Sequence, residues 1–308
     1  MSHPFVGRKD EGRALLLGVQ RGRSTLLVAP PGYGKSHLLE EVRPALGAWA
    51  LLFWTDKVGP FNSFLRDLFR ELWDARVPIP EVNYSKSFEA DLKAWGRRYT
   101  NTDEKARSIV AALKQYQAGG INRPILVIED VSAITPSMVP WLVALAEVAT
   151  LVCGAYPETL RKAGTRKFWM RLDRIDLPPL SPKESRELAE ALVQVYGIVA
   201  EDLEVYLARV SALSGGIPGE LVRLVRYVEA EAIVRNRDVG TGYAQNRAQR
   251  EERGVALAPL LLVLGGAGLV VRTLGLARGE MDLYVAGAVL VGLFIVTGPW
   301  LRKAVVAQ

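Results

Sequence analysis

The sequence predicts an α/β fold in which helices cover both faces of a parallel sheet, followed by a helical subdomain and two apolar membrane helices. Three observations lead to this prediction. Short, continuously apolar segments alternate with amphipathic helical segments over the first 180 residues, which is typical of a parallel sheet buried on both faces. A block of purely helical pattern comes next. About the last fifty residues then hold nearly all the long uncharged runs.

Four apolar segments and a fifth segment, RIDL, are the predicted strands. Helical patterns separate them, and each is short enough to cross a sheet once. Their ranges are 24–29 (STLLVA), 50–55 (ALLFWT), 125–128 (ILVI), 150–154 (TLVCG) and 174–177 (RIDL). Behind the fifth strand, Ser181 is predicted to cap a helix, with Pro182 at its first position and Glu184 completing a capping box.

These elements divide the chain into four predicted regions. An α/β core spans 1–180, with a polar helical insert at 78–120 to which we assign no chemistry. A helical lid subdomain spans 181–237, a juxtamembrane linker 238–254 and a transmembrane hairpin 255–301.

Length and composition limit the available chemistry. With 308 residues the chain is long enough for two compact units. The single cysteine, Cys153, has no partner for a disulfide, and His3 and His37 are too few for a zinc cluster. A metal site must therefore use oxygen ligands.

The net charge is +6 and the isoelectric point is about 9.4. This balance fits a nucleic-acid partner, and it equally fits basic residues that flank membrane helices on the cytoplasmic side. We favour the membrane explanation over nucleic acid. The N-terminal residues MSHPFVGRKDE carry no secretory or lipidation signal, which predicts a cytoplasmic location for the region behind them.

A Walker A pattern, GxxxxGK[ST], follows the first strand, with Ala29 in place of its first glycine. Gly32 and Gly34 let backbone N–H groups surround phosphate oxygens, while the next helix presents its positive end. Lys35 would reach the β- and γ-phosphates, and Ser36 would bind magnesium. We predict ATP and Mg²⁺ as cofactors, with ATP or GTP left open, held by Pro31, Gly32, Tyr33, Gly34, Lys35, Ser36 and His37. The alternative is a glycine-rich turn without a ligand.

Two carboxylates end the third strand and complete the predicted magnesium site. In ILVIED, Glu129 precedes Asp130, the reverse of the usual order of Asp and Glu. We assign the orientation of magnesium to Glu129 and the activation of the attacking water to Asp130, and which of the two is on the metal side stays open. The alternative is a strand that ends in two solvated acids.

Several of these segments together resemble the STAND and origin-recognition branch of the AAA+ ATPases. The resemblance rests on Phe5-Val6-Gly7-Arg8 with Glu11, the phosphate loop, ILVIED, and SGGIPGEL at 214–221, and it covers about residues 4–236. It implies that Val6 and Arg8 lie against the adenine and that Pro218 approaches the nucleotide. It also implies assembly into a homo-oligomer.

The resemblance further places an arginine that acts across a subunit interface at Arg166 or Arg171, and either could equally be a solvated helix charge. Two departures from the pattern predict slow hydrolysis. Gly219 follows the lid proline where related ATPases often have arginine. The sensor position after the fourth strand has the run Cys153-Gly154-Ala155-Tyr156 instead of the usual polar residue or arginine.

Two uncharged segments, 255–271 and 283–301, are the predicted membrane helices. Small residues in both would let the helices pack closely, and basic residues before and behind the pair place both ends in the cytoplasm. The protein is therefore expected in the plasma (inner) membrane, with the lipid bilayer and a membrane-associated protein as partners. The alternative is a pair of buried helices, or an oligomerisation hairpin in solution.

The sequence supports three hypotheses about function. The first is a membrane-anchored ATPase that couples lid motion to a membrane-associated assembly. The second is a nucleotide-dependent signalling or scaffold protein with little turnover. The third is a DNA-handling ATPase tethered at a membrane, although no compact basic patch interleaved with aromatic residues stands out in the sequence.

Overall fold

The structure is a computed structural model that describes residues 4–80, 82–84, 87–119, 122–227, 257–282, 284–289 and 291. The chain divides into two compact units, Met1–Asn236 and Arg237–Gln308, and each is described by itself. The predicted linker 238–254 lies outside the described residues.

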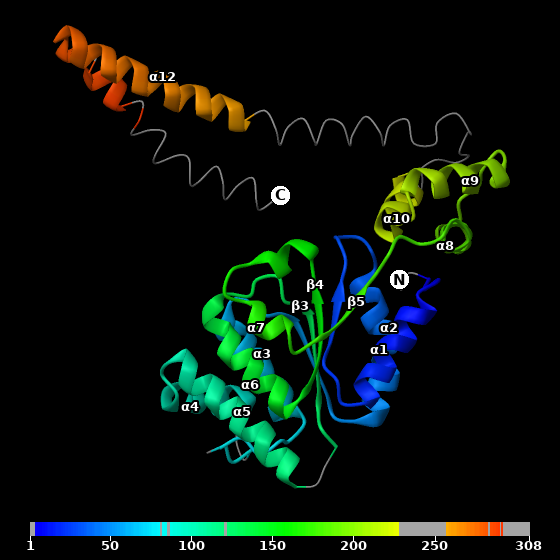
Figure 1. The fold of residues 1–308 in the computed structure, drawn as a ribbon. Helices are drawn as coiled ribbons and strands as arrows, with labels where there is room; N and C mark the ends of the chain where they lie inside the picture. Colours follow the sequence, from blue (N-terminus) through cyan, green and yellow to red (C-terminus); the bar gives the residue numbers. More distant parts are fainter. Residues whose placement is uncertain are drawn as a thin grey trace. The chain divides into compact units, whose positions relative to one another are not determined.

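A five-stranded parallel sheet forms the centre of the first unit (Figure 1). Its strands are β1 (Thr25–Val28), β2 (Leu52–Lys57), β3 (Ile125–Asp130), β4 (Thr150–Ala155) and β5 (Asp173–Asp176). Their order across the sheet is β2-β3-β4-β1-β5, and every neighbouring pair is parallel. All five predicted strands and the parallel sheet are confirmed, with ends that differ by a few residues. The order places β4 between the strand before the phosphate loop and the strand that carries the two carboxylates.

Helices cover both faces of this sheet, as the sequence predicted (Figure 1). One face packs against α1 (Lys9–Gln20) and α2 (Lys35–Trp49), and the other against α3 (Phe61–Asp74), α5 (Thr102–Ala118) and α6 (Val139–Val148), with the short α7 (Arg166–Trp169) beside them. Successive strand residues alternate between the two cores: Leu26 belongs to the α3 side and Leu27 to the α1 side. This period of two explains why the inner strands β1, β3 and β4 are largely apolar, whereas the edge strand β5 is mostly exposed.

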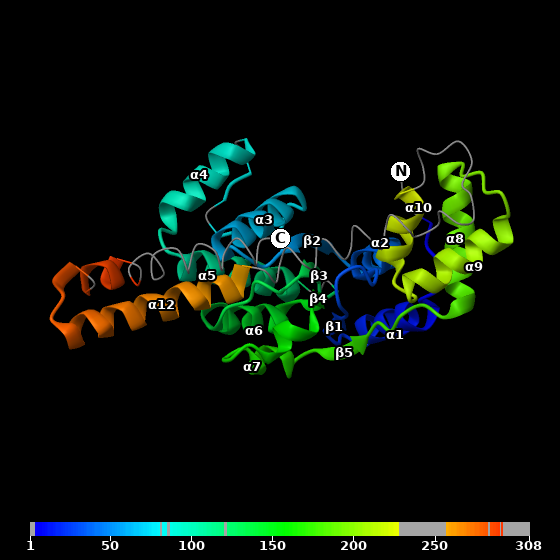
Figure 2. The ribbon, with the colours of Figure 1, turned by 90° about the horizontal axis from the view of Figure 1, so that it is seen from above.

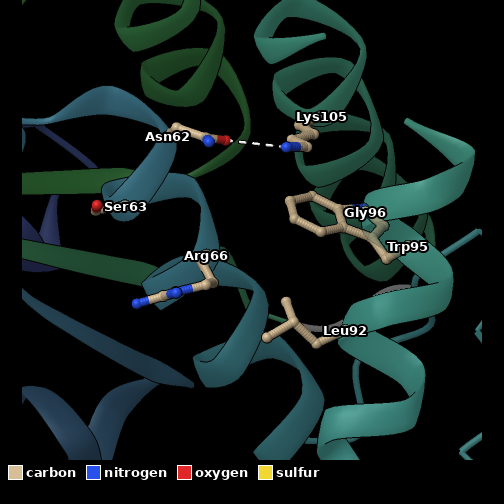
Figure 3. Close-up of a pocket in the computed structure, with 7 residues that line it drawn as sticks. All are labelled: Asn62, Ser63, Arg66, Leu92, Trp95, Gly96 and Lys105. Carbon is tan, nitrogen blue, oxygen red and sulfur yellow. Dashed lines mark hydrogen bonds between the residues drawn. The ribbon is translucent and has the colours of Figure 1, made fainter. Parts of the chain in front are cut away.

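The helix α4 (Phe88–Arg98) lies outside the sheet layers and packs on α3 and α5 through Trp95, which is buried. A cavity of about 190 Å³ lies between these three helices (Figure 3). At its rim, Lys105 Nζ donates a hydrogen bond to Asn62 Oδ1 at 3.1 Å. None of the predicted site residues lines this cavity, so the predicted nucleotide site lies elsewhere in the unit.

Three helices, α8 (Pro182–Tyr196), α9 (Leu203–Ser214) and α10 (Pro218–Tyr227), form a small bundle after β5 (Figures 1 and 2). The predicted capping box at its start is confirmed. Ser181 Oγ accepts a hydrogen bond from Glu184 N at 3.3 Å, and Ser181 N donates to Glu184 Oε2 at 2.8 Å. The buried Tyr206 is among the largest side chains enclosed within the bundle. We call this bundle the lid.

The second unit contains α12 (Leu257–Arg278). The helix continues past Val271, the end of the first predicted span, through Arg272 to Arg278, and it stops where Gly279 adopts a left-handed φ of +69°. The chain behind it returns along α12, because the Arg272 guanidinium lies 5.4 Å from the ring centre of Tyr284.

Across the described residues, no helix is both long enough and apolar enough to cross a membrane. The predicted transmembrane hairpin, and with it the lipid bilayer as a partner, is therefore not supported. The first predicted span, 255–271, corresponds in part to α12, whereas most of the second, 283–301, falls outside the part of the chain that is described.

Candidate nucleotide-binding site

The predicted phosphate loop connects the end of β1 at Val28 to the start of α2 at Lys35. Gly32 and Gly34 have φ values of +82° and +87°, a left-handed conformation that glycine adopts without steric cost. Gly34 is the N-cap of α2, and no side chain caps the first turn of that helix. The helix therefore presents backbone N–H groups and its positive end to the loop, as an anion-binding site requires.

Lys35 is held inside the loop by neutral groups. Its Nζ donates hydrogen bonds to the Ala29 carbonyl at 2.6 Å and the Pro30 carbonyl at 3.2 Å, and it lies 4.2 Å from the centre of the Tyr156 ring. Burial lowers the pKa of Lys35 to about 8, and the nearby carboxylates of Asp130 and Glu158 offset only part of that effect. Phosphate oxygens would supply the negative charge that stabilises this ammonium.

This pKa predicts how ATP affinity changes with pH. Bound phosphates favour protonated Lys35 and raise its pKa, so binding takes up a proton above about pH 8 and the affinity falls as the pH rises further. Calorimetric titration of ATP between about pH 7 and pH 10 should show this decline in the wild type. Lys35→Arg should show none, because arginine stays charged throughout. An equal decline in both proteins would assign the effect to another group.

The two carboxylates at the end of β3 have different surroundings. Glu129 Oε1 accepts a hydrogen bond from Trp54 Nε1 at 2.8 Å, on the side of β2. Asp130 Oδ1 accepts a hydrogen bond from Ser132 N at 2.7 Å. Burial raises the pKa of Tyr156 and lowers that of Lys35, and the charge of Asp130 adds to the first effect and opposes the second. Asp130 is thus the carboxylate that acts on the phosphate loop. The prediction gave the metal side to Glu129, and this geometry favours Asp130 on the side of the loop.

The insertion of β4 between β1 and β3 separates the loop from these acids. Two strand spacings amount to about 10 Å, which leaves room for a phosphate group, a cation and a water molecule. The exposed Ser36 in the first turn of α2 and the carboxylates on β3 supply oxygen ligands alone. Such a set fits Mg²⁺, which keeps several water ligands and needs few from the protein.

The N-terminal turn packs against the phosphate loop. Arg8 is only 6% exposed, with one guanidinium nitrogen 3.1 Å from Glu11 Oε1 and the other donating to the Tyr33 carbonyl at 3.3 Å. Phe5 lies edge-on to His37, with ring centres 5.4 Å apart. Val6 lies half-buried in the same turn. These residues border the phosphate loop, and the contact of Val6 and Arg8 with adenine stays a prediction.

The lid touches the same loop from another direction. Gly219 N, in the first turn of α10, donates a hydrogen bond to the Gly32 carbonyl at 2.8 Å. A Cβ on Gly219 would lie 2.9 Å from Gly32 Cα, and a Cβ on Gly34 would lie 3.9 Å from Pro218 Cγ. Pro218 therefore borders the loop, and there is no space for the arginine that related ATPases often have at position 219.

The structure gives the two candidate arginines different surroundings. Arg171 precedes β5 and pairs with Glu147 at 3.8 Å, so it lies at the end of the sheet opposite the phosphate loop. Arg166 begins α7 and is exposed. An action of either arginine on a neighbouring subunit stays a prediction.

Sequence reasoning missed two residues of the site. The Tyr156 ring contacts the Lys35 ammonium, and Trp54 Nε1 donates a hydrogen bond to Glu129 Oε1. Trp54 lies within β2, whereas Tyr156 directly follows β4, at the edge where the carboxyl ends of parallel strands meet. That position was the available signal for Tyr156, whose aromatic side chain was noted only as a departure from the usual pattern.

The strand order, the loop between β1 and α2, and the carboxylates on β3 define a P-loop nucleotide-binding fold. Among solved structures, the chain is similar to a Walker-type ATPase of Pyrococcus abyssi, with 15% identity and a TM-score of 0.51 over 92% of this chain and 88% of that one. It is also similar to the Aeropyrum pernix ORC1 protein in complex with DNA, with 16% identity and a TM-score of 0.51 over 87% of this chain and 73% of that one.

The Thermotoga maritima RuvB Holliday junction branch migration motor matches with 16% identity and a TM-score of 0.40 over 73% of this chain. The match spans 62% of the length of that RuvB chain. No protein-family model matches the sequence, and no curated protein matches it. At these identities the similarity shows the fold, which is that of P-loop ATPases.

Proposed function

We propose that this protein binds and hydrolyses ATP, and that its lid responds to the occupancy of the phosphate loop. The observation that carries the proposal is the position of Lys35. Its ammonium lies at the positive end of α2, inside a glycine loop, where no carboxylate of the described residues pairs with it. Because the lid donates a hydrogen bond to Gly32 of that loop, a ligand in the loop would also affect the lid.

Each group of the site has a role in this proposal. Backbone N–H groups of the loop and Lys35 hold the β- and γ-phosphates, and Ser36 contributes a hydroxyl ligand for Mg²⁺. ATP supplies the phosphoryl group, and Mg²⁺ neutralises part of its charge when bound. Asp130, on the side of the loop, orients the metal or the attacking water, and Glu129 stays in its hydrogen bond with Trp54. The fixed donors and charges lower the barrier because they are in place before the reaction.

Steady-state ATP turnover tests the proposal and separates the two acids. We expect measurable Mg²⁺-dependent phosphate release by the purified full-length protein. Asp130→Asn should lower kcat by about a hundredfold or more, because it removes the acid near the phosphates, and Glu129→Gln should have a smaller effect. A larger loss of kcat in Glu129→Gln than in Asp130→Asn would assign the metal-side role to Glu129.

The second candidate is a nucleotide-dependent switch with little turnover. The observation that favours it is the end of β4, where Tyr156 stands in place of the polar sensor residue. A protein that binds ATP tightly but releases no phosphate, with or without lipid and candidate partners, would be this switch. Turnover that depends on Asp130 would exclude it.

A DNA-handling ATPase is the third candidate, and the similarity to an ORC1 protein in complex with DNA supports it. A salt titration of DNA binding to the full chain decides this case, since binding by phosphate contacts weakens steeply as salt increases. An absence of binding at low salt would remove the candidate.

Location and assembly are further proposals. We propose that the nucleotide-binding unit lies in the cytoplasm, where ATP is available. We also propose that the protein forms a homo-oligomer in which Arg166 of one copy would reach the site of the next. Light scattering with and without ATP measures the assembly. Cell fractionation with alkaline extraction measures whether the full chain stays with membranes.

A further inference from the structure

Tyr156 occupies a position that the proposed chemistry has not used. It follows β4 directly, and β4 lies between β1, which leads into the phosphate loop, and β3, which ends in Asp130. The end of β4 is hydrogen-bonded on both sides, from Ala29 N to the Ala155 carbonyl at 3.3 Å and from Val131 N to the Gly154 carbonyl at 2.8 Å. The backbone therefore fixes Tyr156 between the loop and the carboxylate.

The Tyr156 ring is in contact with the loop lysine. Lys35 Nζ lies 4.2 Å from the ring centre, a distance at which the face of an aromatic ring attracts a cation. The same ammonium donates to the carbonyls of Ala29 and Pro30. Its direct contacts among the described residues are thus two carbonyls and one ring, all of them neutral.

Two acids act on Lys35 through space without pairing with it. Asp130 and Glu158 both favour its charged form, yet no carboxylate of the described residues lies within 4.0 Å of its Nζ. Asp130 also acts on Tyr156 itself. A partly buried ammonium on a flexible side chain would gain free energy from an ion pair with a nearby carboxylate. The Tyr156 ring contacts the Lys35 ammonium at the end of β4, the strand that separates β1 and its loop from β3 and Asp130.

We propose that the aromatic ring of Tyr156 is a positioning residue that keeps Lys35 from pairing with Asp130. The ring holds the ammonium at the phosphate loop, and Asp130 keeps its carboxylate for the metal or the attacking water. This inference rests on the proposed nucleotide site. It gives the aromatic residue after β4 a role through the lysine and requires no contact between its hydroxyl and the nucleotide.

Without the ring, the Asp130 carboxylate should compete with the phosphates of the nucleotide for Lys35. In Tyr156→Leu, the lysine is free to pair with Asp130, and a phosphate group must break that pair to bind. We expect affinity for ADP about tenfold weaker than in the wild type. Tyr156→Phe keeps the ring and removes the hydroxyl, so it should bind ADP like the wild type.

The second half of the experiment removes the competing acid. In Tyr156→Leu combined with Asp130→Asn, Lys35 has no Asp130 carboxylate to pair with, and affinity should return to that of Asp130→Asn alone. The probe is a fluorescent ADP analogue titrated in excess EDTA, so that any role of Asp130 toward magnesium does not enter. Circular dichroism and thermal melts of each variant establish that it is folded.

The outcomes separate this inference from the function on which it rests. If the wild type binds no nucleotide in titrations with or without Mg²⁺, the proposed function fails. If the wild type binds but Tyr156→Leu binds equally well or better, the positioning role is wrong while the nucleotide site stands. The role is also wrong if Tyr156→Phe is as weak as Tyr156→Leu, or if Asp130→Asn does not restore the affinity of Tyr156→Leu.

Discussion

Replacement of Lys35 by alanine is expected to weaken ATP binding by about a hundredfold or more, because a charge-assisted hydrogen bond to phosphate in a partly buried site is lost. The ammonium is the cation that the structure holds inside the phosphate loop, on the Ala29 and Pro30 carbonyls. Backbone N–H groups of the loop remain in the variant, so the residual affinity measures their share. Calorimetric titration of ATP with Mg²⁺ gives both numbers.

The matched control is Lys114→Ala. Lys114 is an exposed lysine on α5, and its loss changes the net charge equally without touching the loop. We expect wild-type affinity and turnover from it. Lys35→Ala should unfold at a temperature close to that of the wild type, since burial disfavours the charge that is removed. Equal affinities of the two variants for ATP would contradict the assignment of Lys35 to the phosphates.

Replacement of Gly154 by alanine is expected to lower the free energy of unfolding by about 3 kcal/mol or more. A Cβ at this position would lie 2.1 Å from the Glu129 carbonyl oxygen, and both strands lie in the middle of the sheet. Because the clash is with backbone, no side-chain rotation relieves it, and β3 and β4 must move apart. The movement shifts Glu129 and Asp130, so ATP turnover should fall as well.

Urea denaturation measures this change, and Gly96→Ala is its control. Gly96 lies inside α4, and a Cβ there meets no atom within 4 Å. The control should gain about 0.5–1 kcal/mol from the better helix propensity of alanine. If Gly154→Ala and Gly96→Ala unfold at similar urea concentrations, the close approach of β3 and β4 is not as the structure places it.

Local patterns predicted most of the first unit. Continuous apolar segments identified the inner strands β1, β3 and β4, since a strand buried on both faces has no polar side. Ser181, Pro182 and Glu184 identified the start of the lid, since capping depends on neighbours in sequence. The phosphate loop was predicted from its glycines and its lysine, and their conformations agree with that prediction.

The contacts between distant segments could not be predicted in this way. The order of the strands decides that Tyr156 meets Lys35 and that Trp54 meets Glu129, and no local pattern encodes that order. The end of the first predicted membrane span differs from the structure for another reason. That end was set where the uncharged run stops, but α12 continues through Arg272, since a charged residue does not end a helix.

The hydrogen bond from Gly219 N to the Gly32 carbonyl joins two backbone segments of the chain, and no side chain takes part in it. When a phosphate group reshapes the loop, the start of α10 must follow or break this bond. The phosphate loop and the lid are therefore coupled through backbone peptide groups. Alanine scanning of the surrounding side chains would largely overlook this coupling. A Cβ added at Gly219, 2.9 Å from Gly32 Cα, would disturb the connection directly.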